Sequence, residues 1–462
     1  MTETKVMNRW WVVVGALVIQ VSLGAVYIWS VFQSPLLEFF PSWTETQVTL
    51  PAQIVLASFA LAVILGGRIQ DRLGPRIVAT GGGIILGLGL ILARFAYAFE
   101  PGTALVWLIL TYAVLGGIGI GMAYVCPIAT CVKWFPDKRG LVTGLAVAGF
   151  GAGAFFFAPL ARGLICGDAY MLFNLSLFNL PQVGVFNAFM TLGIIFLVIV
   201  VAGAQLLKNP PDGYRPEGWW PPEGTTAAQA PKVDFTPRQM LRTPAFWLLW
   251  ITYFAGCTAG LQVIMKASPI WQSFSFGEMT GPIPHATYLD VTAMGATAVS
   301  FLAIFNAAGR IFWGKVSDMM DRRVTLLIMF LLCGGMMLTL DFMRLFPLYL
   351  LWIGVVALCF GGFLSLYPAL TADFFGTRHI GTNYGLMFTA YGAGGIIGPY
   401  LAARFMHIVE HIPYLTVCPR GTTQQVMFAI GDYSLAFWVA GGACIIAAVL
   451  IMQVKPDKIQ QK

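Results

Sequence analysis

Arg310 is the residue of this 462-residue chain whose type and surroundings point most directly to chemistry. It lies in an apolar run at residues 291–313, where a charge is costly and therefore indicates a function. Arginine keeps its charge and can hold a carboxylate through two parallel hydrogen bonds. Asn306 precedes it by one helical turn on the same face. The pair predicts a site for an anionic group; the alternative is that Arg310 extends to a polar boundary near Gly314.

Other polar and aromatic side chains inside apolar runs are candidates to complete this site. Tyr124 and Tyr367 lie beside Pro127 and Pro368, and their hydroxyls can bond a carboxylate or a hydroxy group. Ordinary packing is the alternative for each candidate. The remaining candidates are Tyr27, Tyr391, Gln262 and Phe150.

Motifs that would indicate a metal, a cofactor or an enzyme's active site are missing from the sequence. There is no Cys-x-x-Cys, no His-Glu-x-x-His and no P-loop. Most of the eight cysteines lie in apolar runs, where a thiol behaves as a small hydrophobic group. Cys166 and Cys418 fall in expected outer loops, where we expect free thiols. We therefore expect no cofactor, no metal and no enzymatic activity.

The elements that must position these residues are membrane-spanning helices. Hydrophobic residues make up 58% of the chain and charged residues 10%, whereas a soluble domain carries about a quarter charged residues. A span needs about 20 apolar residues. The expected spans are residues 10–33, 48–67, 77–96, 104–130, 140–162, 185–207, 244–266, 291–313, 324–344, 347–372, 383–406 and 433–453. The pattern predicts an all-α membrane protein with twelve transmembrane helices in two six-helix bundles.

The positions of lysine and arginine predict the orientation in the membrane. Most of the 27 basic residues fall in alternate connections, which is typical of segments that face the cytoplasm. We expect both termini inside, and the net charge of +7 reflects this asymmetry rather than nucleic-acid binding. A Pro/Gly-rich stretch at 208–243 is typical of a cytoplasmic linker, so the predicted bundles are 1–207 and 244–462. The outer stretches 267–290 and 407–432 are expected as long loops without an assigned role.

Two segments of the first half recur in the second. The first repeat relates Gly67, Asp71 and Arg72 to Gly314, Asp318 and Arg322. The second relates Pro127, Gly140, Gly144, Gly151 and Gly153 to Pro368, Gly381, Gly385, Gly392 and Gly394 at identical spacing. Glycine lets helix ends approach closely, and aspartate can pair with arginine or cap a neighbouring helix. We expect the first repeat to form a conformational latch, and both repeats indicate pseudo-symmetric halves.

These motifs resemble those of a known family. The loop at 71–74, its weaker copy near Asp318 and the layout of six plus six spans resemble the Major Facilitator Superfamily. The runs at 43–45, 133–144 and 210–219 are similar to its oxalate–formate antiporter and monocarboxylate transporter branch. The resemblance implies the major facilitator fold, transport by alternating access and location in the cytoplasmic (inner) membrane. It also implies that the Asn306/Arg310 pair binds a carboxylate.

The departures from the branch bear on the substrate. Oxalate-exchanging members carry a lysine in helix eleven, whereas this chain has none from Asn383 to Ala403 and places Tyr391 about there. One buried cation favours a small monocarboxylate such as lactate or formate. Animal members have an aspartate where this chain has Asn306, and no carboxylate lies mid-span, so the group that would carry a proton is not identified. We expect a monomeric carrier in the lipid bilayer, moving a small carboxylate with a proton; the alternatives are oxalate–formate exchange and a membrane enzyme or receptor that kept the fold.

Overall fold

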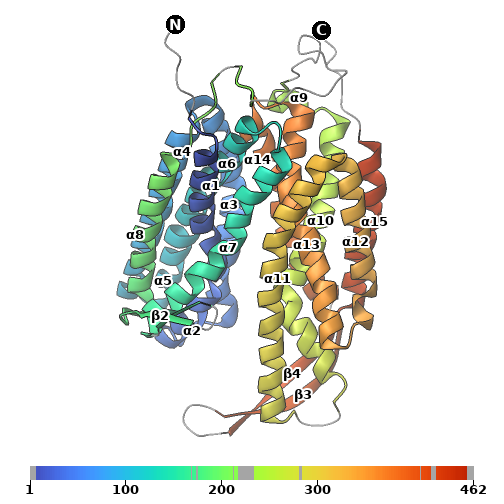
Figure 1. The fold of residues 1–462 in the computed structure, drawn as a ribbon. Helices are drawn as coiled ribbons and strands as arrows, with labels where there is room; N and C mark the ends of the chain where they lie inside the picture. The colour runs from blue at the N-terminus through green and yellow to red at the C-terminus, as the bar shows by residue number, and fades with distance from the viewer. Residues whose placement is uncertain are drawn as a thin grey trace. The chain divides into compact units, whose positions relative to one another are not determined.

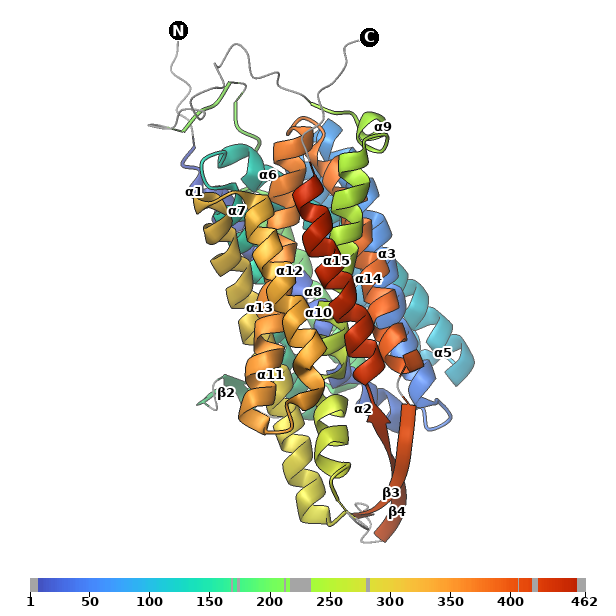
Figure 2. The same ribbon diagram turned by 90° about the vertical axis from the view of Figure 1, so that its right-hand side faces the viewer.

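The computed structural model describes residues 7–167, 169–172, 175–211, 213–216, 234–279, 283–405, 407–417 and 423–454, and helices dominate it (Figure 1 and Figure 2). The first half contains α1 (Trp10–Leu23), η1 (Gly24–Ile28), α2 (Ser30–Phe39), α3 (Glu45–Leu73), α4 (Pro75–Ala93), η2 (Arg94–Ala98), α5 (Pro101–Leu108), η3 (Ile109–Leu115), α6 (Gly116–Trp134), α7 (Arg139–Cys166), β1 (Ala169–Leu172), β2 (Leu175–Asn179) and α8 (Gly184–Ala204). The second half contains α9 (Pro237–Met240), α10 (Pro244–Phe276), α11 (His285–Met319), α12 (Arg322–Thr339), η4 (Leu340–Phe342), α13 (Phe346–Phe375), α14 (Ile380–Phe405), β3 (His407–Val417), β4 (Thr423–Asp432) and α15 (Ser434–Gln453).

Each predicted span corresponds to a helical pass among the described residues. Ten of these passes are long and apolar enough to cross a bilayer by length and composition. The other two are α11 and α14, whose 35 and 26 residues also exceed the length that a span needs. The chain is a multi-pass membrane protein, and the prediction of twelve helical spans is confirmed.

The turn between α3 and α4 shows how local sequence sets these boundaries. Helix α3 begins at a capping box, in which the Thr44 hydroxyl accepts from Gln47 N and the Gln47 side chain accepts from Thr44 N. It ends at Gly74, whose φ of +86° is open to glycine and strained for other residues. Pro75 then starts α4 in the first-turn position where a missing N–H costs nothing. The loop motif of the first repeat therefore occupies a sharp helix–turn–helix.

Spatial contacts between Cα atoms divide the chain into two compact units, which we describe separately. The first contains Met1–Phe246, Ser365–Gly392 and Pro456–Lys462, and the second contains Trp247–Leu364 and Ala393–Lys455. The adjoining ends of α13 and α14 therefore pack with helices of the first half. The predicted division divides the chain in sequence order, with bundles at 1–207 and 244–462 and a linker at 208–243. It stays a prediction.

Helices of the first unit approach one another through glycine. A Cβ on Gly119 of α6 would lie 2.4 Å from Leu86 N and 2.7 Å from Gly82 O of α4. Only a residue without a side chain allows this contact, and small residues at such crossings are the main way in which membrane helices pack closely. Elsewhere the spans depart from α-helical geometry: the first contains the 3-10 segment η1, and the fourth contains the π-helical segment η3.

The stretches at 267–290 and 407–432 differ from the expected loops. Helix α10 continues to Phe276 and α11 already begins at His285, so most of 267–290 is helical and the expectation of a loop there is wrong. At 33 and 35 residues, these helices are about 50 Å long, longer than the hydrocarbon core, so polar sequence at their ends does not terminate them. Residues 407–417 and 423–432 pair as an antiparallel hairpin, β3–β4 (Figure 2). Gly431 N donates to Ser273 Oγ of α10 at 3.2 Å, which ties the hairpin to this helix.

Candidate functional site

Arg310 lies in α11 with its side chain inside the second unit. Only 1% of the residue is exposed, and its Nε donates to Asn306 Oδ1 at 2.9 Å. The helical spacing that suggested the pair is therefore realised as a hydrogen bond. Because the guanidinium is buried, the geometry disfavours the alternative in which it extends to a polar boundary near Gly314.

The crossing of α11 and α13 fixes the backbone that carries this pair. A Cβ on Gly309 would lie 2.0 Å from Leu358 O, and a Cβ on Gly361 would lie 2.1 Å from Asn306 O and 3.1 Å from Arg310 N. Both contacts are with backbone atoms, so no side-chain movement can relieve them. Two glycines therefore let α13 press directly against the turn of α11 that presents Asn306 and Arg310.

Gln262 is a second buried polar group of this unit. It lies on α10 and is fully buried, and among the described residues neither its Nε2 nor its Oε1 has a hydrogen-bond partner. Thr258 Oγ1, one turn earlier, is also buried without a partner there. Gly398 of α14 packs against this turn, with a virtual Cβ 2.7 Å from Thr258 O. An unsatisfied buried amide is expensive, so Gln262 is available to a ligand or to water.

Four other predicted residues gather in an aromatic cluster of the first unit. The hydroxyls of Tyr27 and Tyr391 lie 2.7 Å apart and share a hydrogen bond. Phe150 makes edge contacts with Tyr27 and Tyr124, at centroid distances of 5.5 and 5.2 Å. Phe388, which sequence reasoning missed, lies 5.0 Å from Tyr124 and stacks on Tyr391 at 4.7 Å. Phe388 lies one helical turn before Tyr391 in the sequence, and this spacing could have predicted that the two share a face.

The remaining candidate, Tyr367, is fully buried on α13, and its carbonyl accepts from Thr371 Oγ1. It belongs to the first unit, as the aromatic cluster does, whereas Arg310, Asn306 and Gln262 belong to the second. The candidates therefore fall into two sets, one in each unit.

The latch prediction takes a definite form at the first repeat. Both carboxylate oxygens of Asp71 are engaged at the start of α14: they accept from Gly381 N at 3.0 Å and from Thr382 N and Oγ1, each at 2.7 Å. A Cβ on Gly67 would lie 2.1 Å from Gly381 O, so this glycine permits the approach. Asp71 thus caps a helix N-terminus, where the helix dipole favours an anion. Arg72 is exposed and takes no part in these bonds.

In the second repeat, the aspartate pairs with an arginine instead of capping a neighbouring helix. Asp318 Oδ1 forms an ion pair with Arg322 at 3.0 Å, and Arg322 also donates to Ser317 Oγ at 2.8 Å. Gly314 is buried one turn earlier. The two copies therefore differ: Asp71 reaches a helix far along the chain, while Asp318 pairs locally.

Further contacts at the same end of α13 and α14 were not predicted. Phe235, which falls within the expected linker, donates its N–H to Phe375 O at 3.0 Å, and its carbonyl accepts from Asn383 Nδ2 at 3.0 Å. Arg139 forms an ion pair with Asp373. Their partners are more than 130 residues away along the chain, so local sequence carried no signal for them.

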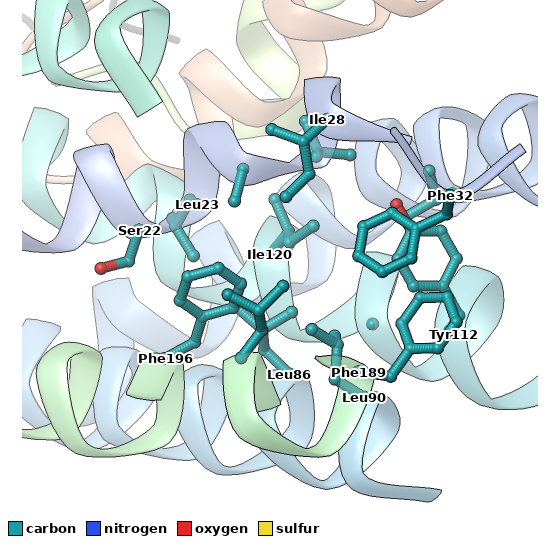
Figure 3. Close-up of a pocket in the computed structure, with 15 residues that line it drawn as sticks. Ser22, Leu23, Ile28, Phe32, Leu86, Leu90, Tyr112, Ile120, Phe189 and Phe196 are labelled. Atoms are coloured by element: carbon teal, nitrogen blue, oxygen red, sulfur yellow. The ribbon is translucent and has the colours of Figure 1, made fainter. Parts of the chain in front are cut away.

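An apolar cavity lies apart from these groups (Figure 3). It has a volume of about 20 Å³ and is lined by residues of α1, η1, α2, α3, α4, η3, α6 and α8 of the first unit. Ser22 and Tyr112 supply its hydroxyl groups, and the rest of the lining is hydrophobic. Such a space suits no anion.

Among the described residues, no group of three His, Cys, Asp or Glu could hold a metal ion. Cys166 is an exposed free thiol, and Cys418 lies outside the described residues.

A family model described as the Major Facilitator Superfamily matches residues 7–399 and 282–462. The chain belongs to the Major Facilitator Superfamily. It is therefore a transporter and not an enzyme. The proton:xylose symporter XylE has a similar structure, with a TM-score of 0.65, 13% sequence identity, and coverage of 97% of this chain and 96% of that one. This likeness confirms the twelve-helix major facilitator fold.

Curated relatives confirm the branch that the motifs suggested. The transporter is 28% identical to the oxalate:formate antiporter of Oxalobacter formigenes, over 86% of this chain and 84% of the relative. It is 27% identical to apicoplast pyruvate carrier 1 of Toxoplasma gondii, over 75% and 68% of the two chains. Its identity to monocarboxylate transporter 12 of Rattus norvegicus is 24%, over 85% and 74%.

Proposed function

We propose that this transporter moves small monocarboxylates by alternating access, with Arg310 as the cation that binds the carboxylate. The observation that carries the proposal is a guanidinium, 1% exposed, held by the neutral side chain of Asn306. This bond orients Nε without cancelling the positive charge. The relatives named for oxalate and formate, for pyruvate and for monocarboxylates all handle small carboxylates by their names, which supports this substrate class.

A buried charge suggests how binding and movement are coupled. A cation inside the membrane is costly, and a bound carboxylate lowers that cost by forming charge-assisted hydrogen bonds. The loaded carrier would then expose its site to each side of the membrane in turn. The buried amide of Gln262 is proposed to bond the substrate, and Tyr27, Tyr124, Phe150, Tyr367 and Tyr391 are proposed to line its path. We further propose proton symport, a monomeric carrier, two bundles joined by the linker, and an inner-membrane location with both termini inside.

Uptake into proteoliposomes tests the role of Arg310. Labelled lactate, formate, pyruvate and oxalate are supplied to the parent, to Arg310→Lys and to Arg310→Gln. Lysine keeps the charge but loses the two-pronged geometry, so kcat/KM for monocarboxylates should fall about 10- to 100-fold, the worth of one or two charge-assisted bonds. Arg344→Lys is the matched control, because Arg344 is exposed and pairs with Asp341 at the end of the ninth span. Transport by Arg310→Lys equal to that of the parent would refute the assignment.

Exchange of oxalate for formate is the second candidate, supported by the antiporter relative. The two mechanisms differ in what drives uptake. An imposed inward proton gradient should accelerate monocarboxylate uptake into empty vesicles if symport operates. If uptake ignores the gradient and instead requires an anion inside the vesicle, the transporter is an exchanger.

A further inference from the structure

A basic groove lies at the Leu73 end of α3. Arg68, Ile69, Arg72 and Leu73 form it, and it offers about 290 Å³ of open space. All four residues are exposed, and the two arginines are one helical turn apart on the same face. Asp71, which lies between them in sequence, points to α14 instead. The groove therefore contains Arg72, the arginine of the first latch motif, which takes no part in the bonds between Asp71 and α14.

Among the residues that the structure describes, no carboxylate pairs with either guanidinium group of the basic groove. Within the described ranges, neither Arg68 nor Arg72 forms an ion pair or a hydrogen bond with another residue. Two other arginines of the first unit differ, since Arg76 donates to Gln205 O at 2.7 Å and Arg9 pairs with Asp137 at 2.7 Å. Like charges one turn apart repel each other, and an anion bound between them would remove that repulsion.

An apolar stripe of α3 leads to the basic groove. Leu61 and Leu65 are 66% and 59% exposed, and they lie on the same face of the helix as Arg68 and Arg72. Exposed leucines on a membrane-spanning helix contact acyl chains. Along this face, the helix thus presents apolar side chains first and two cations at its end. A phospholipid presents the complementary order, with acyl chains first and then a phosphate.

We propose that the basic groove binds an anionic phospholipid, with its phosphate between Arg68 and Arg72 and an acyl chain along Leu61 and Leu65. Arginine holds phosphate through paired hydrogen bonds, and anionic lipids gather at the cytoplasmic leaflet, which attracts basic segments. Phosphatidylethanolamine carries its own ammonium group and therefore needs the two cations less. Free phosphate lacks the acyl chain. The site is independent of the substrate that Arg310 binds.

Native mass spectrometry of the detergent-solubilised full chain tests the proposal, with dioleoyl phosphatidylglycerol, dioleoyl phosphatidylethanolamine and inorganic phosphate as probes. The parent should bind phosphatidylglycerol more tightly than phosphatidylethanolamine, and millimolar phosphate should not displace it. Each guanidinium near an anionic headgroup contributes about fivefold in affinity, so R68Q/R72Q should weaken phosphatidylglycerol binding about thirtyfold. R68K/R72K should stay within about fivefold of the parent, because both charges remain.

R238Q/R242Q is the matched control, since it removes an exposed pair of the same spacing from around α9. It should leave phosphatidylglycerol binding unchanged. Equal binding of the two lipids by the parent, displacement by phosphate, or an equal loss in the control pair would overturn the proposal. If R68Q/R72Q aggregates on size-exclusion chromatography, L65Q decides: weaker binding of phosphatidylglycerol supports the acyl-chain path, and unchanged binding refutes it.

Discussion

Replacing Asp71 by alanine should release the start of α14 from α3. The carboxylate accepts three hydrogen bonds, at 3.0, 2.7 and 2.7 Å, from Gly381 and Thr382. A single capping bond is worth about 1 kcal/mol, and a bond to a charged group about 1.5–3 kcal/mol. Since the site is only part-buried and the bonds are not additive, we expect a loss of about 3 kcal/mol, or about a hundredfold in the equilibrium between docked and released states.

Hydrogen–deuterium exchange reads this equilibrium at the bonded atoms themselves. The peptide that contains the Gly381 and Thr382 amides should exchange up to about a hundredfold faster in Asp71→Ala. Asp71→Asn keeps one acceptor oxygen and should fall between the variant and the parent. The start of α12, capped by Asp321, is the internal control.

Two outcomes would refute this reasoning. Unchanged exchange at the start of α14 would mean that Asp71 does not hold it. Equal acceleration at the start of α12 would mean that the substitution loosens the whole protein rather than the latch.

Three further predictions concern packing, pH and the aromatic cluster. Gly116→Ala should raise the free energy of unfolding by about 1 kcal/mol through helix propensity, because the added Cβ would meet no atom closer than 3.8 Å. Gly119→Ala should instead lower the melting temperature, because its Cβ would lie 2.4 Å from a backbone nitrogen. The Arg323 side-chain hydrogen bond lowers the pKa of Asp321, so Asp321 stabilises the fold above its unfolded pKa of about 4 and loses this effect as the pH falls through its folded pKa. Asp321→Ala should therefore melt earlier than the parent at neutral pH, with the difference vanishing in acid; a constant difference would contradict this. Tyr391→Phe should raise the KM for monocarboxylate uptake about fivefold, the worth of one hydroxyl hydrogen bond, and an unchanged KM would remove Tyr391 from the substrate path.

Much of the fold was predictable because hydrophobic length and helical period are local properties of the sequence. The length of the apolar runs predicted the spans. The four-residue spacing placed Asn306 and Arg310 on one helix face, where the structure joins them by a hydrogen bond. The same approach failed at 267–290, where polar residues looked like a loop but continue α10 and α11 beyond the hydrocarbon core. The β3–β4 hairpin was missed for a related reason, since pairing between strands depends on register rather than on local composition.

The sequence by itself determined that this chain is a helical membrane transporter with an arginine inside an apolar span and a repeated loop motif. Only the tertiary structure decided what the repeated residues do. Asp71 and Asp318 occupy equivalent motif positions, yet one caps α14 and the other pairs with Arg322. The difference arises because Gly67 and Gly381 let two distant backbones meet, and such an approach depends on the packing of whole helices rather than on any local pattern.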